Sequence, residues 1–446
     1  MALRIIPFRR SRPRSFSPRR LAEILPANKP QALPRRLRRP FVSLPKDIRT
    51  RGRKLASRLP VVRERQRRNR NRYLVPLLAA GGVAGLLVAR EVLQRAREMD
   101  LEGRVVIITG GSRGLGFLLA REFLRQGANV AICARDSEEL LLAERELEAI
   151  GGQVFAYRCD VSDPSEVEQF VQLVSRRLGP PDVLVNNAGV LEVGPLESMD
   201  HDDFRQAMDV MFWGVLNPTL AVLPYMREKH SGRIVNITSI GGLVSMPHLL
   251  AYCSAKFAAT GFSEGLRAEL AGTGIRVTTV SPGLMRTGSH VNAHYKGHGR
   301  EEFRWVSLMD GAPVISMDAE RAARQIVRAA RRGEAQRILS LPANVLARLH
   351  GVAPGLTTGI ASLANRVLPS DGVGSQHTRG ADLEPSLDSR LYRTATIWGR
   401  KAAERFQHQP SPAAAPTRAE KPISPNTAGP RPLEQPAPAP GEPPPH

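Results

Sequence analysis

The stretch Arg104-Val-Val-Ile-Ile-Thr109-Gly110-Gly111-Ser112-Arg113-Gly114-Leu115-Gly116 decides the fold of this 446-residue chain. Its apolar run, Val105 to Ile108, is typical of a parallel strand that is buried on both faces. The residues after Gly116 have helical periodicity, so the glycines fall on a strand-to-helix turn. Glycine lets such a turn approach a pyrophosphate closely, and the helix N-terminus offers free N–H groups. The stretch therefore predicts dinucleotide binding, with a purely structural turn as the alternative.

Downstream of this turn, strands and helices alternate as in a doubly wound α/β sheet. Further strands are predicted at residues 129–134, 153–158, 182–186, 232–238, 275–280 and 337–341. Helices are predicted at residues 138–150, 164–178, 202–226 and 252–271. The predicted fold class is therefore α/β, with a doubly wound parallel sheet.

A tyrosine and a lysine four residues apart indicate acid–base chemistry. They are Tyr252 and Lys256, and Ser239 precedes the tyrosine by thirteen residues. Four residues make about one helical turn, so the phenol and the ammonium share a face. The lysine charge favours the ionised phenol and is expected to lower the pKa of Tyr252, which makes it a usable proton donor near neutral pH. A surface pair on an ordinary helix is the alternative if the two residues are considered alone.

Over residues 101–345 the chain closely resembles the short-chain dehydrogenase/reductase family. The matching motifs occur in the family's order: Thr109-Gly-Gly-Ser-Arg-Gly-Leu-Gly116, Cys159-Asp-Val161, Asn186-Asn-Ala-Gly189, Ser239, Tyr252-x3-Lys256 and Ser281-Pro-Gly-x3-Thr287. The resemblance implies one Rossmann-type catalytic domain whose substrate pocket lies at the C-terminal ends of the strands. It also implies an enzyme, an NAD(P)-dependent oxidoreductase that acts on CH-OH or C=O groups.

The resemblance also assigns roles to individual residues. Tyr252 is implied as the general acid/base, Lys256 as the residue that holds the nicotinamide ribose, and Ser239 as a hydrogen-bond donor to the substrate oxygen. Tyr252 and Lys256 would also contact the cofactor, and the implied cofactor-binding set is completed by Gly110, Ser112, Arg113, Gly114, Leu115, Gly116, Arg135, Asp160, Val161, Asn187, Ala188, Gly189, Pro282, Gly283 and Thr287.

One position departs from the family pattern. The family's fourth catalytic residue is an asparagine in the long helix, and Met211 stands in its place here. Methionine cannot make that side-chain hydrogen bond, although backbone carbonyls can still anchor a proton-relay water. The Ser-Tyr-Lys set is intact and predicts catalysis. The alternative is a catalytically weak, NADP-sensing scaffold that binds phosphates of membrane or nucleic acid.

The end of the second predicted strand bears on cofactor choice. NAD-preferring relatives usually close this strand with a carboxylate, whereas Ala134 and then Arg135 stand here. Arg113 in the glycine turn is a second cation, and two guanidiniums suit a 2′-phosphate by charge and bidentate geometry. Asp136 opposes this weakly, because it is expected to cap the next helix. NADP(H) is therefore favoured over NAD, with carbonyl reduction as the usual direction.

Residues 284–317 are predicted to form a substrate lid. Its large apolar side chains predict a hydrophobic, lipid-like carbonyl or alcohol substrate, or else only packing of the lid: Leu284, Met285, Val291, Tyr295, Phe303, Trp305, Leu308 and Met309. Three histidines recur every four residues, at positions 290, 294 and 298, but have no neighbouring acidic or cysteine ligands. They are expected to be solvated, and no metal site is predicted.

Residues 1–72, the basic arm, carry 24 Lys or Arg against three Asp or Glu and so hold nearly all of the net charge of +22. With scattered prolines and little apolar periodicity, this arm is predicted to be disordered. Its charge suits the phosphates of anionic lipid or nucleic acid. Nucleic acid is disfavoured because the arm has no recognition motif and few aromatics. Its prolines argue against a transit peptide.

Residues 73–89, the apolar segment, contain no charged residue and are just long enough to cross a bilayer. They predict a transmembrane or membrane-inserted segment, with a buried core helix as the alternative. The positive-inside rule would send the catalytic domain across the membrane. NADPH supply, and arginines at positions 90, 95 and 97, instead favour shallow insertion with the domain facing the cytoplasm.

The C-terminal part is predicted to be an extension, residues 346–410, followed by a Pro- and Ala-rich disordered tail, residues 411–446. Residues 343–369 are predicted to form an amphipathic helix against the domain or the bilayer. The three cysteines, Cys133, Cys159 and Cys253, show no disulfide or metal-ligand spacing. Homo-oligomer formation is an expectation from the family resemblance only.

Overall fold

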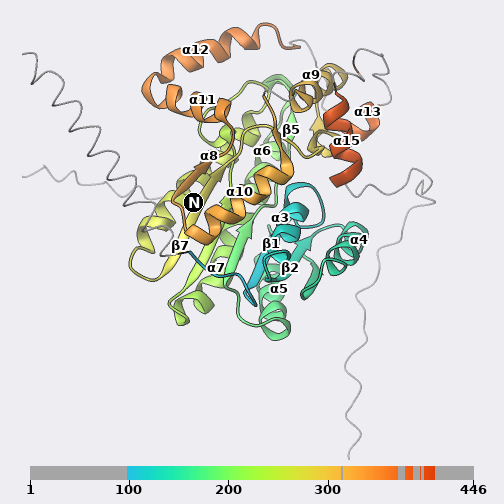
Figure 1. The fold of residues 1–446 in the computed structure, drawn as a ribbon. Coiled ribbons are helices and arrows are strands. Elements are labelled where there is room, and N and C mark those ends of the chain that lie inside the picture. Colours follow the sequence, from blue (N-terminus) through green and yellow to red (C-terminus); the bar gives the residue numbers. More distant parts are fainter. Residues whose placement is uncertain (1–97, 313–314, 370–376, 385–391, 393–395, 407–446) are drawn as a thin grey trace, which may run out of the picture. The chain divides into compact units, whose positions relative to one another are not determined.

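The computed structural model describes residues 98–312, 315–369, 377–384, 392 and 396–406 (Figure 1). Its centre is a seven-stranded parallel sheet in the order β11-β7-β6-β4-β1-β2-β3. The strands are β1 (Val105–Thr109), β2 (Asn129–Ala134), β3 (Val154–Arg158), β4 (Val183–Asn186), β6 (Gly232–Ile237), β7 (Ile275–Ser281) and β11 (Gln336–Ile338). The strand order reverses between β1 and β4, which confirms the predicted doubly wound α/β class.

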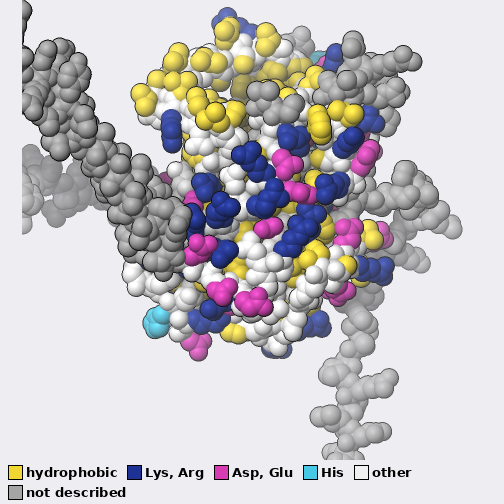
Figure 2. Space-filling view, in the orientation of Figure 1, with side chains coloured by type: hydrophobic (Ala, Val, Ile, Leu, Met, Phe, Trp, Pro, Cys, Tyr) yellow, Lys and Arg dark blue, Asp and Glu magenta, His cyan; other side chains and the backbone are white. Residues whose placement is uncertain are grey.

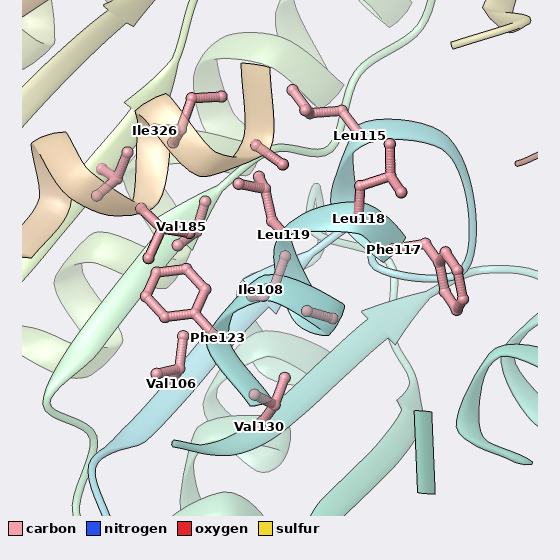
Figure 3. Close-up of a cluster of buried hydrophobic side chains, with 14 of the residues drawn as sticks. Val106, Ile108, Leu115, Phe117, Leu118, Leu119, Phe123, Val130, Val185 and Ile326 are labelled. Atoms are coloured by element: carbon pink, nitrogen blue, oxygen red, sulfur yellow. The ribbon is translucent and has the colours of Figure 1, made fainter. Parts of the chain in front are cut away.

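Helices cover both faces of this sheet, which explains why β1 is apolar along its whole length. Val106 and Ile108 pack with residues of α3 (Gly114–Leu124), α4 (Ser137–Glu148) and α10 (Ala319–Arg332) (Figure 3). Val105 and Ile107 belong to the opposite cluster, with α5 (Pro164–Arg177), α7 (Gly214–Glu228) and α8 (Leu250–Glu269). Successive strand side chains point to opposite faces, so a strand between two helical layers needs apolar residues at every position.

The predicted helix at residues 202–226 is interrupted by a segment of wider turns. It consists of α6 (His201–Met208), the π-helical segment η3 (Asp209–Trp213) and α7. Among the described residues, this run of 28 residues is the one helix long and apolar enough to cross a membrane, and its most apolar 18-residue window has a mean hydropathy of 1.2. Half of its most apolar window is buried inside the protein, so we treat it as a core helix.

The lid contains more regular structure than the sequence predicted. The strands β5 (Glu192–Val193), β9 (His294–Tyr295) and β12 (Thr378–Arg379) form a small three-stranded sheet. Strand β8 (Met285–Arg286) pairs with β10 (Met317–Asp318), and α9 (Gly299–Gly311) lies between β9 and β10 in the chain. Two-residue strands carry no periodicity of their own, so they could not be predicted from the sequence.

Residues after the sheet form further helices: α11 (Leu341–Val352), α12 (Pro354–Asn365), α13 (Gly380–Leu383) and α15 (Ile397–Phe406). The single amphipathic helix predicted at residues 343–369 is two helices, because the residue before a proline disfavours helical geometry and Pro354 opens the second. Helix α15 returns to the body, where Ala402 and Phe406 join the core that contains α3. The basic arm, the apolar segment and the tail at residues 411–446 lie outside the described residues.

Candidate active site

The turn after β1 is built to take a phosphate group close to its backbone. Gly110 has a φ of +63°, which an L side chain rarely adopts. A Cβ atom on Gly116 would lie 2.0 Å from the Gly110 carbonyl oxygen. Asn187, at the end of β4, donates from its side-chain amide to the carbonyls of Thr109 (3.1 Å) and Gly110 (3.0 Å). These contacts fix the turn, and a side chain at Gly110 or Gly116 would collide with neighbouring backbone, so glycine is needed for the turn to pack this tightly.

A buried carboxylate that the sequence analysis missed lies at the adenosine end of this cleft. Glu139 forms an ion pair with the Arg113 guanidinium and accepts a hydrogen bond from the Ser112 hydroxyl at 3.2 Å. It stands in the first turn of α4, whose N-cap, Asp136, accepts hydrogen bonds from two backbone N–H groups as predicted. Arg135 is exposed at the rim. The signal for Glu139 was its place in the helix turn directly after β2.

Asp160, predicted to lie near the adenine, uses one carboxylate oxygen for hydrogen bonds within its own turn. Its Oδ1 accepts hydrogen bonds from the backbone N–H (3.0 Å) and the hydroxyl (2.7 Å) of Ser162. Asp160 nevertheless lines the same cavity as Arg113 and Arg135. Its position therefore suits a contact to the base at the cavity edge.

The serine and tyrosine of the predicted catalytic set are joined by a hydrogen bond. Ser239 follows β6 and caps a short 3-10 helix, where its Oγ accepts the Gly241 N–H at 3.0 Å. The Ser239 hydroxyl also forms a hydrogen bond with the Tyr252 phenol. Because the end of β6 and the start of α8 meet here, the two hydroxyls face one cavity.

Lys256 lies one turn after Tyr252 and is only 5% exposed. Its Nζ donates to the Ile237 carbonyl at 2.9 Å and lies 5.9 Å from the centre of the Tyr252 ring. Burial lowers the pKa of Lys256 to about 8. Burial also raises the pKa of Tyr252 to about 12, against the lowering effect of the Ser239 bond. The predicted lowering of the Tyr252 pKa is therefore wrong here, because desolvation of the buried phenol is the largest effect on it.

Met211 lies at the place where the family pattern has its asparagine, and its side chain is only 1% exposed. It belongs to the π-helical segment η3. A Cβ atom on Gly189 would lie 3.8 Å from both Met211 Sδ and Lys256 Nζ, so these two atoms border one point. A thioether is only a weak acceptor, so Met211 itself offers no strong hydrogen bond at this position.

One cavity of about 950 Å³ brings the predicted site residues together. Every one of them lines it except Gly116, which packs behind the turn; the far side of the cavity includes Pro282, Gly283 and Thr287. The lid residues divide into two groups. Four face the cavity: Leu284, Met285, Trp305 and Met309. Of the other four, Tyr295, Phe303 and Leu308 pack in the core of the lid, and Val291 is buried. Part of the apolar lid therefore lines the cavity, and part packs the lid itself.

The three lid histidines do not share one helical face. His290 is buried, and its Nδ1 lies 2.8 Å from Asp310 Oδ2, so the expectation that it is solvated is wrong. His294 is half-buried in β9, and His298 is exposed before α9. The two-residue strand and the turns around it break the four-residue repeat that a helix would have presented.

The sheet, the glycine turn and the Ser-Tyr-Lys site together define a nucleotide-dependent oxidoreductase. The family profile described as short chain dehydrogenase matches residues 104–296. Over 257 residues the chain is 34% identical to SadH, an oxidoreductase of Mycobacterium tuberculosis, with 56% of this chain and 92% of that protein covered. It is 33% identical to dehydrogenase/reductase SDR family member 7B of Danio rerio, with 56% and 82% covered.

Two further similarities complete the comparison. The chain is 36% identical to 11-beta-hydroxysteroid dehydrogenase A of Sesamum indicum, with 53% of this chain and 68% of that protein covered. A solved short-chain dehydrogenase from Streptomyces avermitilis superposes with a TM-score of 0.52 at 29% identity, covering 59% of this chain and 97% of that one. The chain therefore belongs to the short-chain dehydrogenase/reductase family. It is an enzyme, an oxidoreductase that acts on CH-OH or C=O groups.

Proposed function

We propose that this enzyme uses NADP(H) to reduce the carbonyl of a hydrophobic, lipid-like substrate, or to oxidise the matching alcohol. The observation that carries the proposal is the cavity itself. Cations border its adenosine end, Ser239 and Tyr252 lie at its centre, and apolar lid and helix residues line the remainder. A single cavity with these three regions suits a phosphorylated dinucleotide beside an apolar substrate.

The residues of the site can then be assigned roles in the proposed reaction. When bound, a nicotinamide cofactor supplies or accepts the hydride. Ser239 Oγ accepts the Gly241 N–H, and its own hydrogen, which faces the Tyr252 phenol, can turn to a substrate oxygen and stabilise negative charge there. Tyr252 gives its proton to that oxygen in reduction and takes it back in oxidation. The Lys256 ammonium, one turn away, is placed to bind ribose hydroxyls.

The preference for NADP(H) rests on the cations of the adenosine end. No carboxylate closes β2, because Ala134 ends the strand. Glu139 balances the charge of Arg113 and orients its guanidinium. Arg135, at the exposed rim, then supplies the charge that a 2′-phosphate needs.

The apolar part of the cavity supports a hydrophobic substrate. Met246, Leu249 and Trp305 line it, together with Leu346 of α11. The name of the Sesamum indicum relative specifies a hydroxysteroid, which is an apolar alcohol of this general kind. A steroid substrate is not proposed for this chain, because no contact in its cavity selects a steroid over other apolar alcohols.

The exposed face of α11 and α12 supports membrane association. Figure 2 shows hydrophobic side chains gathered over these two helices. Val352 is 87% exposed and Leu363 is 63% exposed. The seventeen residues between Arg348 and Arg366 contain no Lys, Arg, Asp or Glu. Such a face is costly in water and suits the apolar layer of a bilayer, with the arginines at lipid headgroups.

Helix α11 contributes both to this exposed face and to the cavity, because its residues Ala343 and Leu346 line the cavity. We therefore infer that an apolar substrate enters from the bilayer beside α11. The apolar segment, residues 73–89, would add an anchor, and the catalytic domain would lie on the cytoplasmic side, where NADPH is supplied. The catalytically weak scaffold is the second candidate, and Met211 is the observation that favours it.

An assay of the purified full-length protein separates the two candidates. The measurement is oxidation of NADPH at 340 nm with a panel of hydrophobic ketones and aldehydes, beside small polar ketones as controls. We expect turnover with the hydrophobic members and weak or no turnover with the polar ones. NADPH binding without turnover on any member would favour the scaffold.

A further inference from the structure

A cluster of metal-ligand side chains lies outside the catalytic set, in the small sheet of the lid. Strand β5 pairs with β9 so that Glu192 lies beside His294. Strand β12 pairs with β9 from the other side, and His377 directly precedes β12. Figure 1 shows β5 close to α9 and α13, which flank β9 and β12 in the chain. Three segments far apart in sequence thus bring one side chain each to one place.

The side chains are close enough to share an ion. One potential ligand atom from each of Glu192, His294 and His377 lies within 4.8 Å of the other two. The two imidazole rings have their centres 5.7 Å apart and cross at 78°. Ligand atoms around a tetrahedral Zn²⁺ are about 3.3 Å apart, given metal–ligand distances near 2.0–2.1 Å. Small side-chain rotations would close the cluster around an ion.

Glu192 gives a second, independent indication. Its side chain is only 3% exposed, and neither carboxylate oxygen has a hydrogen-bond partner among the residues that the structure describes. A buried carboxylate without partners is costly. The nearby cation does not resolve this, because Lys296 Nζ is held by Asp203 at 2.7 Å and Asp200 at 3.2 Å. A metal ion bound by Glu192 would compensate the buried carboxylate.

The surroundings also suit the histidines as ligands. Asp203 Oδ1 lies 3.3 Å from His377 Nε2, and a carboxylate behind an imidazole orients the ring and leaves Nδ1 for a metal.

We propose that Glu192, His294 and His377 bind one divalent transition-metal ion, with Zn²⁺ the best match to a His₂-carboxylate set. A water molecule would complete the tetrahedron on the exposed side of His377. The ion would fasten β12 to the lid strand β9. Because His294 and Arg379 also line the main cavity, the ion would order one edge of it. This proposal does not depend on the substrate or on the cofactor preference.

Metal binding by the full-length protein tests the proposal. The protein is stripped with a chelator, dialysed and titrated with ZnCl₂, and bound zinc is measured by mass spectrometry and calorimetry. Co²⁺ is added in parallel, because tetrahedral Co²⁺ has an intense visible absorption. We expect one Zn²⁺ per chain, the tetrahedral Co²⁺ spectrum and a rise of Tm with Zn²⁺.

Three variants locate the ion. Glu192→Gln and His377→Ala should each weaken Zn²⁺ binding by at least about tenfold and abolish the Co²⁺ spectrum. His298→Ala, at an exposed histidine of the same lid, should bind like the wild type. His377 is partly exposed, so its loss leaves a folded protein even if Glu192→Gln lowers Tm. Equal affinity in all four proteins, or no binding by the wild type at millimolar Zn²⁺, would overturn the site.

Discussion

The acid–base chemistry of single residues is set by burial in this active site. Burial raises the pKa of Tyr252 to about 12 and lowers that of Lys256 to about 8. Both shifts disfavour the charged form, so the phenol is neutral and the Lys256 ammonium loses its proton more readily than that of an ordinary lysine. The sequence could predict which residues meet, since the spacing on one helix decides that. It could not predict the pKa of Tyr252, because desolvation depends on the packing of β6, the lid and α8 together.

The pKa of Lys256 makes stability depend on pH. Between about pH 8 and the ordinary lysine value of 10.5, the unfolded chain binds this proton more readily than the folded chain. The contribution of Lys256 to the free energy of unfolding therefore rises with pH across this window, by on the order of 3 kcal/mol. We expect Lys256→Met to be more stable than the wild type at pH 7 and to lose most of that advantage by pH 10. Urea unfolding at both pH values measures it, and a pH-independent difference would contradict the assignment.

Substitution of Met211 tests whether the missing asparagine weakens proton relay. Its buried thioether borders Lys256 and offers no strong hydrogen bond. If this departure weakens proton relay, Met211→Asn should leave turnover unchanged or raise it. Met211→Leu is the matched control, since it keeps the apolar volume at a cost below about 1.5 kcal/mol. Loss of turnover in Met211→Asn alone, with Tm also reduced, would show that Met211 serves packing instead.

Arg135 carries the proposed choice of cofactor. Removing its guanidinium should weaken NADPH binding by about 1.5–3 kcal/mol, the usual worth of a charged hydrogen bond. NADH has no 2′-phosphate, so its affinity should hardly change in Arg135→Ala. Fluorescence titration with both cofactors measures this, with Arg145→Ala, at an exposed arginine of α4, as the control. Equal losses for NADPH and NADH would point to a structural role for Arg135.

At the scale of elements, long periodic segments were predicted well and short ones were not. The strands of the central sheet were predicted to within a few residues, because most of them contain an apolar run between helices. The π-helical segment η3 and the strand pairing of the lid depend on tertiary contacts. Glu192 and His377 were missed for that reason: each lies in or beside a strand of two residues, far from its partners in the chain.

The helices α11 and α12 make the membrane proposal testable. A chain that starts at Met99 removes both the basic arm and the apolar segment, so its residual binding to vesicles reports on these helices. In this chain, Val352→Asp with Leu363→Asp should reduce sedimentation with phosphatidylcholine–phosphatidylglycerol vesicles by at least about tenfold, since each side chain loses apolar burial. Leu141→Asp, at an exposed leucine of α4, is the control. Equal binding by all three chains would show that the exposed face of α11 and α12 does not bind the membrane.

At the scale of the whole molecule, the chain joins the parallel sheet of its family to a lid and helices that give the cavity regions of different chemistry. The sheet and the glycine turn could be predicted from motifs, since their geometry is local. The division of the cavity into cationic, catalytic and apolar regions needed the structure, because it unites the turn after β1, the lid and α11. The basic arm and the apolar segment, which hold most of the charge and the predicted anchor, lie outside the described residues.

The central claim is that Tyr252 and Ser239 serve hydride transfer between NADPH and a hydrophobic carbonyl. NADPH labelled with deuterium at C4 of the nicotinamide, on either face, tests it when incubated with the best ketone or aldehyde of the panel. We predict deuterium on the carbinol carbon of the product from one of the two labelled forms, detected by mass spectrometry. Tyr252→Phe keeps the ring but removes the proton, so its product should fall at least about a hundredfold while NADPH binding persists. Absence of label in the wild-type product, or equal product from Tyr252→Phe, would contradict the account.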